Sequence, residues 1–346
     1  MAKKLLEVPH SCCPFSCVTN GIRDVFQWKT EMELPDEFLL LTTGFAHFVY
    51  FKQRKRKPPL AVYWALTLKQ QYKNVEKAFG IKLEVKEGLS FSRALKLVKT
   101  EVNRGNPVVV GPLDLYHLEY REDFYQKEHA LPHFVLAVGY DDEEEVLFVH
   151  DCDLEGVQKL SFDSLKRAWA KDEPGYAKKN TVVKVRVPRE VPSFEEVAKR
   201  ALRHKAEQML RPSSELLGVP GMRRVAEEIG KWEKELDKKN YKAALKITAM
   251  YANTPPTLSR EVGDFTGKRK ELCKLLRELS SVTGLEQLEY LSEVFETSGE
   301  LIREICYVIL DWLEGEEDRR EKLPELFSKL AAVEEAGYEE LEEVVS

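Results

Sequence analysis

The chain has 346 residues, of which 43% are hydrophobic and 32% are charged. This length and balance exclude a small disulfide-stapled scaffold and a wholly disordered chain, and they predict about two globular domains. Lysine and arginine number 53 against 59 aspartate and glutamate residues, a net charge of -6, so no overall positive field favours nucleic acid as a partner.

The first ten residues contain two lysines but lack the apolar core of a signal peptide. The richest apolar stretch, residues 38–51, is interrupted by Thr42, Thr43, Gly44 and His47. It is shorter than the roughly 20 residues needed to span a bilayer. We therefore expect a cytoplasmic protein without a membrane partner, in which the six cysteines are thiols rather than a disulfide framework.

The first 190 residues combine helical and strand patterns. Apolar residues at helical spacing occur over 18–28 and 92–104 and, in whole or in part, over 36–50 and 61–79. Strand patterns follow in series at 107–111, 133–138, 146–149, 158–161 and 181–187. Helices followed by antiparallel strands predict an α+β domain over residues 1–190.

A break in the pattern follows at residues 187–193. Two prolines end the last strand, and Ser193 with Glu196 forms a capping-box pattern that opens a helix. No strand pattern occurs after this point, whereas residues 271–279 and 285–313 have helical periodicity. We therefore predict an all-helical domain over residues 191–346.

Residues 133–151 predict a β-hairpin that brings a histidine close to an acidic side chain. A strand led by His133 is followed by a polar turn at 141–144 and a returning strand. If the turn centres between residues 142 and 143, His133 faces residue 152, and a shift of one residue places Asp151 opposite it. Asp153 remains an alternative. A carboxylate in this position would hold the imidazole in one tautomer and stabilise its cation.

Cys17 is the preferred nucleophile for such a pair, because it opens the first helical pattern. The N–H groups and the dipole at a helix start stabilise a thiolate. Cys12 and Cys13 are weaker candidates because they lie in a preceding loop. The order of these residues predicts a catalytic set of Cys17, His133 and Asp151.

The motifs resemble the papain-like superfamily, especially its double-glycine leader peptidases, and more closely the butirosin biosynthesis acyltransferase family. The likeness covers nearly the whole chain and is carried by residues 17–26, 34–45, 114–120, 133–141 and Asp151. It implies a papain-like fold over 1–190 followed by a companion helical domain. It further implies transfer of an acyl group from a carrier-protein or coenzyme A thioester through Cys17 to an amine, without a cofactor.

The resemblance leaves the oxyanion donors open, because Ser11 stands where the peptidases have a glutamine. The backbone N–H of Cys17 is the default donor, and the side chains of His10 and Ser11 are further candidates. The cluster of His10 with the nearby cysteines could instead bind zinc. We predict no metal, because no second ligand pair at finger spacing follows.

Further alternatives concern the donor and the reaction. Five basic residues in a short run are typical of a solvated loop, but they could also attract an anionic acyl donor. They are Lys52, Arg54, Lys55, Arg56 and Lys57. A cysteine peptidase or amidase with the same residues and a non-catalytic papain-like binding module are the rival functions, and a homo-oligomer stays open.

Overall fold

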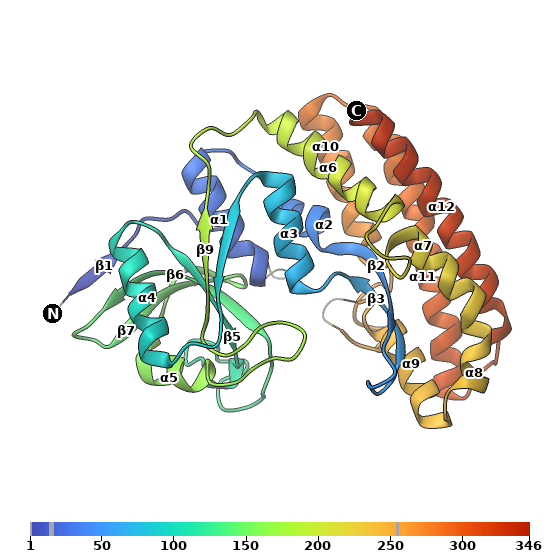
Figure 1. Cartoon of the computed structure of the whole chain (residues 1–346), viewed down its shortest axis with the longest axis horizontal. Helices are drawn as coiled ribbons and strands as arrows, with labels where there is room; N and C mark the ends of the chain where they lie inside the picture. Colours follow the sequence, from blue (N-terminus) through green and yellow to red (C-terminus); the bar gives the residue numbers. More distant parts are fainter. Residues whose placement is uncertain (1, 14–16, 254–255) are drawn as a thin grey trace. The chain divides into compact units, whose positions relative to one another are not determined.

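The computed structural model describes residues 2–13, 17–253 and 256–346 and divides the chain into two compact units (Figure 1). The first unit contains Met1–Leu39 and Thr67–Pro192, and the second contains Leu40–Leu66 and Ser193–Ser346. Residues 40–66 thus group with the helices that follow Ser193, although they lie inside the sequence range predicted for the first domain. Together the elements make an α+β protein.

An antiparallel sheet of seven strands organises the first unit. The strand order is β4–β9–β5–β6–β7–β8, and β1 pairs with β6. The bounds are β1 (Lys3–Leu5), β4 (Lys82–Lys86), β5 (Val108–Leu113), β6 (His133–Asp141), β7 (Val146–Asp151), β8 (Leu154–Ser161) and β9 (Thr181–Arg186). The five strands expected from sequence in this unit are confirmed, whereas β1 and β4 were not predicted.

The helices of the first unit include several that pack on this sheet. They are α1 (Cys17–Thr30), α3 (Leu68–Phe79), α4 (Phe91–Asn103), η1 (Leu115–His117) and α5 (Phe162–Ala168), and α2 (Phe38–Thr43) spans the division between the units. Helix α1 packs closely on β5 and β6 at Gly21. A Cβ at Gly21 would lie 3.1 Å from the Leu136 Cβ and 3.2 Å from Val109 Cγ2, so glycine permits this close approach.

Two strands replace parts of the predicted helices in the second unit. The segments expected to be helical in whole or in part contain β2 (Phe45–Lys52) and β3 (Leu60–Ala65), which pair antiparallel. Phe48 and Trp64 are buried, and the Trp64 Nε1–H donates to the Thr248 carbonyl at 3.0 Å. Thr248 is almost 190 residues from β3, so a local helical pattern could not reveal this partner.

The rest of the second unit is helical. Its helices are α6 (Phe194–Leu210), α7 (Gly218–Glu228), η2 (Ile229–Lys231), α8 (Trp232–Glu235), α9 (Lys238–Met250), α10 (Arg269–Thr283), α11 (Gln287–Glu314), η3 (Arg320–Lys322) and α12 (Leu323–Val344). The predicted capping box at Ser193 and Glu196 is confirmed. Within the described ranges, none of the helices combines the length and the apolar character needed to cross a membrane.

Candidate active site

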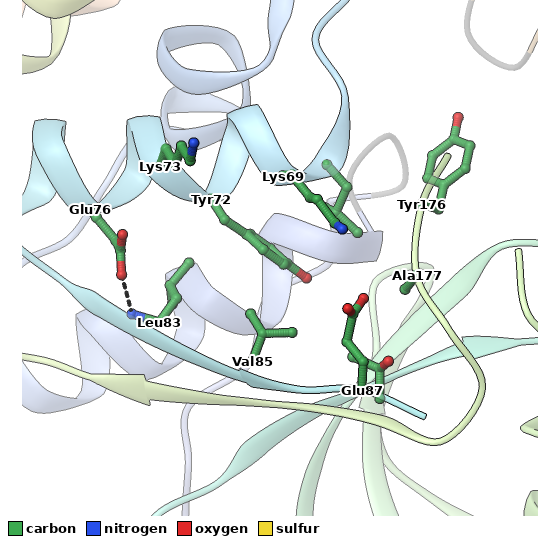
Figure 2. A pocket seen from close by; sticks show the side chains of 11 residues that line it. Lys69, Tyr72, Lys73, Glu76, Leu83, Val85, Glu87, Tyr176 and Ala177 are labelled. Atoms are coloured by element: carbon green, nitrogen blue, oxygen red, sulfur yellow. Dashed lines mark hydrogen bonds between the residues drawn. The ribbon is translucent and has the colours of Figure 1, made fainter. Parts of the chain in front are cut away.

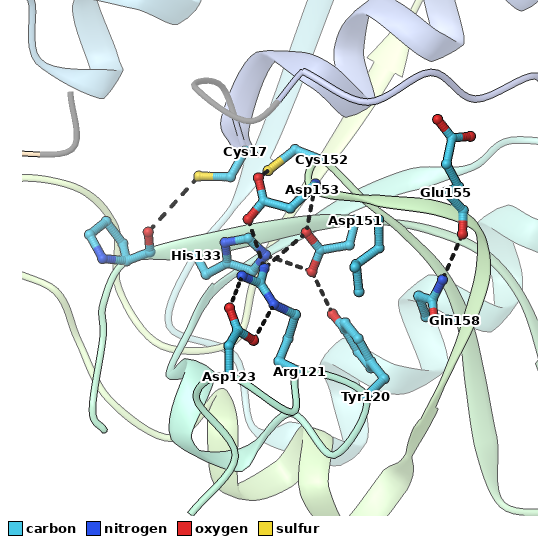
Figure 3. Close-up of polar contacts among 12 residues, drawn as sticks. Cys17, Tyr120, Arg121, Asp123, His133, Asp151, Cys152, Asp153, Glu155 and Gln158 are labelled. Carbon is cyan, nitrogen blue, oxygen red and sulfur yellow. Dashed lines mark hydrogen bonds and ion pairs between the residues drawn. The ribbon is translucent and has the colours of Figure 1, made fainter. Parts of the chain in front are cut away.

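The first unit brings together three side chains that sequence analysis selected. Cys17 is the first residue of α1, His133 is the first residue of β6, and Asp151 is the last residue of β7 (Figure 3). Strands β6 and β7 form the predicted hairpin, with Asp141 paired to Val146. The hairpin therefore carries the histidine and the carboxylate at the same end of the sheet.

His133 and Asp151 form a buried ion pair. The Nε2 atom of His133 lies 2.8 Å from Asp151 Oδ2, and both side chains are buried. Burial alone would lower the pKa of His133, but the charge and hydrogen bond of Asp151 outweigh it and raise the pKa to about 10. A hydrogen bond that the imidazolium donates to the Cys17 sulfur adds to this increase in the pKa of His133. The carboxylate thus stabilises the imidazolium.

Cys17 lies close to the start of β6. Its Sγ is half-buried and lies 4.0 Å from the carbonyl oxygen of Pro132, the residue before His133. Since Nε2 of His133 is bonded to Asp151, Nδ1 is the ring atom left for the thiol. One imidazole can therefore exchange a proton with Cys17 while its other nitrogen stays on the carboxylate.

Further partners hold the Asp151 carboxylate in place. The Tyr120 hydroxyl donates to Oδ2 at 2.9 Å, and Arg121 Nη1 lies 3.5 Å from Oδ1 and 2.9 Å from Asp153 Oδ2. Burial would raise the pKa of Asp151, but His133, Arg121 and Tyr120 hold it well below its ordinary value. Asp151 is therefore the carboxylate that contacts His133, and Asp153 contacts Arg121 instead.

Tyr120 and Arg121 did not emerge from sequence reasoning as site residues. Tyr120 ends one of the segments that carry the family resemblance, which was the available signal. Arg121 is also held by Asp123 through two hydrogen bonds of 3.1 and 3.0 Å. The loop that precedes β6 thus supplies a cation beside the buried carboxylate.

The other cysteines of this region are less suited to act as nucleophiles. Cys152 is buried, its thiol donates to Asp153 Oδ1 at 3.2 Å, and burial raises its pKa far above the ordinary value, with nearby acidic groups adding to the effect. Burial also raises the pKa of Cys12 and of Cys13. Each of these groups is stabilised as the neutral thiol.

The two side chains considered as oxyanion donors have other partners. His10 Nδ1 lies 2.7 Å from Asp24 Oδ2, and its Nε2 lies 3.0 Å from the Asp151 carbonyl and 3.1 Å from that of Leu154. The Ser11 hydroxyl accepts a hydrogen bond of 2.8 Å from Arg23. His10 therefore ties the β7–β8 turn to α1 with both ring nitrogens, whereas the Ser11 hydroxyl accepts from Arg23 and keeps its own hydrogen to donate.

Two groups of side chains could hold a metal ion within the part of the chain described. One is His133, Asp151 and Cys152, and the other is His10, Asp24 and His150; in each, the ligand atoms lie within 4.8 Å of one another. In the second group both nitrogens of His10 are hydrogen-bonded. The hydrogen bonds of His10 account for its position without a metal.

The His150 ring makes the stability of this region depend on pH. It stacks on His10 with centroids 4.5 Å apart, and burial, strengthened by the nearby His10 charge, lowers its pKa to about 4. An unfolded histidine titrates near pH 6.5. Between about pH 6.5 and 4 the unfolded chain therefore binds a proton that the folded chain does not, so acidification through this window destabilises the fold.

We expect His150→Gln to remove this dependence. Between pH 7 and pH 5 the wild-type free energy of unfolding should fall by about 2 kcal/mol more than that of the variant. Urea unfolding at a series of pH values measures the difference, and His129→Gln, which replaces a largely exposed histidine, serves as the control. Parallel stability curves for wild type and His150→Gln would contradict the assignment.

The basic run lies in the second unit. All five of its residues are exposed and belong to the end of β2 and the turn before β3. Lys52 is held by Glu228, with Nζ 2.7 Å from Oε2. Arg54, Lys55 and Lys57 extend from the turn.

The geometry defines an α+β domain in which a half-buried thiol lies beside a buried imidazole–carboxylate pair. Residues 16–152, which include Cys17, His133 and Asp151, match the family described as butirosin biosynthesis protein H, N-terminal. Residues 163–255 match a domain of unknown function, DUF4872. The chain thus has a butirosin biosynthesis protein H N-terminal domain followed by a companion domain, which confirms the resemblance to the butirosin biosynthesis family.

The second match does not follow the two compact units. It begins at residue 163, near the start of α5, and runs through β9 into the helices of the second unit. No curated protein matches the chain.

Proposed function

We propose that this chain is a thiol-dependent acyltransferase whose first unit has a papain-like fold. The observation that carries the proposal is the buried His133–Asp151 pair, joined at 2.8 Å, beside the half-buried thiol of Cys17. Such a pair next to a thiol is the arrangement that activates cysteine for acyl transfer. The name of the family, which concerns butirosin biosynthesis, favours a biosynthetic reaction.

The first half of the reaction moves the acyl group to the enzyme. His133 takes the proton of Cys17, and the thiolate attacks the carbonyl carbon of an acyl thioester to form a tetrahedral oxyanion. When this intermediate collapses, the C–S bond to the donor breaks and the donor thiol leaves with the proton from His133. The acyl group is then a thioester of Cys17.

The second half moves the acyl group to an amine. The amine nitrogen attacks the Cys17 thioester and loses a proton to His133. The bond to Cys17 breaks, Cys17 regains the proton as a thiol, and an amide is released. Asp151 orients His133 and stabilises its cation in both halves, and the steps need no cofactor.

The fate of the acyl-enzyme distinguishes transfer from hydrolysis. Protein acylated with a hexanoyl thioester of N-acetylcysteamine is separated from excess donor and mixed with a panel of primary amines. Acyltransfer predicts an amide product and faster loss of the protein-bound acyl mass in the presence of a productive amine. Release of free hexanoic acid alone, at a rate that no amine changes, would favour the cysteine hydrolase instead.

We further propose that the basic run recruits an anionic donor, either a carrier protein or coenzyme A. The triple reversal of Arg54, Lys55 and Lys57 to glutamate should raise the donor KM about tenfold at low salt and weaken its salt dependence, with kcat little changed. Lys52 is left intact because it holds Glu228. An N-acetylcysteamine thioester, which lacks the anionic group, is the control donor. An unchanged KM for both anionic donors would show that the basic run is a solvated turn with no role in donor binding.

A further inference from the structure

A pocket of about 260 Å³ lies in the first unit between α3, β4 and the segment that leads into β9 (Figure 2). Its walls are mainly apolar and include Leu68, the ring of Tyr72, Leu83 and Val85. This volume is less than twice the cavity of ~150 Å³ that accepts benzene, so it suits an apolar group of roughly ten heavy atoms.

Charged side chains lie around the pocket without filling it. Lys69 and Lys73 extend from α3, and Glu87 follows β4. Glu76 accepts a hydrogen bond of 2.9 Å from the Leu83 backbone and so helps to join α3 to β4. An apolar ligand with one polar end fits this distribution better than a ligand that is polar throughout.

Tyr72 is the unusual residue of the pocket wall. It is only 8% exposed, and its buried hydroxyl has no hydrogen-bond partner among the described residues. Figure 2 shows its ring crossing the pocket, with the hydroxyl directed away from α3. A buried hydroxyl without a partner is costly, and a ligand oxygen that accepted its hydrogen bond would recover that cost.

The hydroxyl also lies within electrostatic range of Cys17. Burial raises the pKa of Tyr72 far above its ordinary value, and charges on Cys17 and Glu87 raise it further. The group is therefore a protonated donor at neutral pH. Both ring nitrogens of His10, one of the side chains first considered for this role, are already hydrogen-bonded.

We propose that the pocket binds the apolar part of the acyl group and that the Tyr72 hydroxyl donates a hydrogen bond to the acyl oxygen while Cys17 attacks. This inference rests on the proposed function and names its substrate class, an acyl thioester with an apolar chain. A donor aimed at the oxyanion stabilises the transition state more than the ground state. Tyr72 thereby supplies the donor that the sequence left open.

The hydroxyl is tested by comparing two reactions of Cys17. In Tyr72→Phe, the rate of acylation by hexanoyl-N-acetylcysteamine should fall about 100-fold. Alkylation of Cys17 by iodoacetamide forms no oxyanion and should change less than twofold. Tyr140→Phe is the matched control, because Tyr140 lies in the same unit and its hydroxyl already bonds Asn103. Equal losses in both reactions, or no loss in either, would overturn the donor role.

The pocket is tested by varying the length of the acyl chain in the thioester donor. Acylation by acetyl, butyryl and hexanoyl thioesters should rise in kcat/KM by about threefold for each added CH₂ group. Val85→Trp should abolish this increase, so that the three thioesters react with similar kcat/KM, whereas Val157→Trp, at a comparably exposed valine outside the pocket, should preserve the increase. Identical chain-length profiles for the two variants would overturn the pocket assignment.

The wild-type protein separates this inference from the proposed function. If wild-type Cys17 reacts with iodoacetamide but gains no acyl mass from any thioester, the proposed function fails and this inference fails with it. If wild-type protein is acylated but the Tyr72 and Val85 variants behave as their controls do, the proposed function stands and this inference alone is wrong.

Discussion

His133→Ala should lower the rate of Cys17 acylation by roughly 1,000-fold or more at pH 7, because the variant lacks the base that accepts the thiol proton. The ring is the only imidazole in contact with Asp151 Oδ2 among the residues described, at 2.8 Å. The acyl-enzyme is measured by intact mass after rapid mixing with an acyl thioester. Alkylation of Cys17 by iodoacetamide should also lose its wild-type pH profile.

His129→Ala is the matched control for this change. His129 bonds Asp114 at 2.8 Å and stacks on Tyr116, so its removal also breaks a histidine–aspartate contact in the first unit. It should leave acylation within about threefold of wild type. An unaltered alkylation profile in His133→Ala would contradict the pairing with Cys17 and favour a non-catalytic binding module.

Asp151→Asn should lower the rate of Cys17 acylation by about 100-fold, a smaller loss than that expected for His133→Ala. The amide carries no charge to stabilise the imidazolium, and its NH₂ group can hold the ring in the wrong tautomer. The hydroxyl of Tyr120 retains an oxygen to which it can donate. Thermal unfolding is followed in parallel, because the substitution also removes an ion-pair partner of Arg121.

Asp153→Asn separates the catalytic effect from the loss of an Arg121 partner. Asp153 contacts the same guanidinium at 2.9 Å, but His133 contacts Asp151 instead. The Asp153→Asn variant should lower the rate of Cys17 acylation by less than threefold. Equal losses in the two aspartate variants would show that Arg121 pairing, rather than support of His133, explains the effect of Asp151→Asn.

The hairpin was predictable because its polar turn and β-branched strands are local signals, but its register was not. Strand pairing shifts between Ala137 and Gly139, where β6 has an irregularity. A Cβ at Gly139 would lie 2.5 Å from the Lys4 carbonyl oxygen, so β1 and β6 approach closely here. Neither this shift of pairing nor the close approach of β1 leaves a periodic signal in residues 133–151.

The strands β2 and β3 could not be predicted from the sequence for a related reason. Their aromatic residues satisfy a helical spacing as well as an alternating one, so periodicity alone could not choose between them. The deciding contacts come from the helices after Ser193, such as the hydrogen bond of 3.1 Å from the Val62 backbone to the Thr248 hydroxyl. Long-range packing of this kind also determines that residues 40–66 join the second unit.

The candidate site also combines residues that a local pattern predicts with contacts that only the fold reveals. Cys17 and His133 could be proposed because each begins an element whose pattern is local. The partners of His10 could not, because they come from α1 and from the turn after Asp151. Tyr72 looked like an ordinary apolar-face residue of a helix, and only the fold places its hydroxyl in a buried pocket wall without a described partner.

The mass of intact protein after exposure to a hexanoyl thioester tests whether Cys17 is the nucleophile that carries the acyl group. We predict that wild-type protein gains one hexanoyl mass, that the mass maps to the peptide containing Cys17, and that Cys17→Ala gains none while Cys12→Ala and Cys13→Ala behave as wild type. Acylation that persists in Cys17→Ala, or its absence from a wild-type protein whose Cys17 reacts with iodoacetamide, would contradict the account.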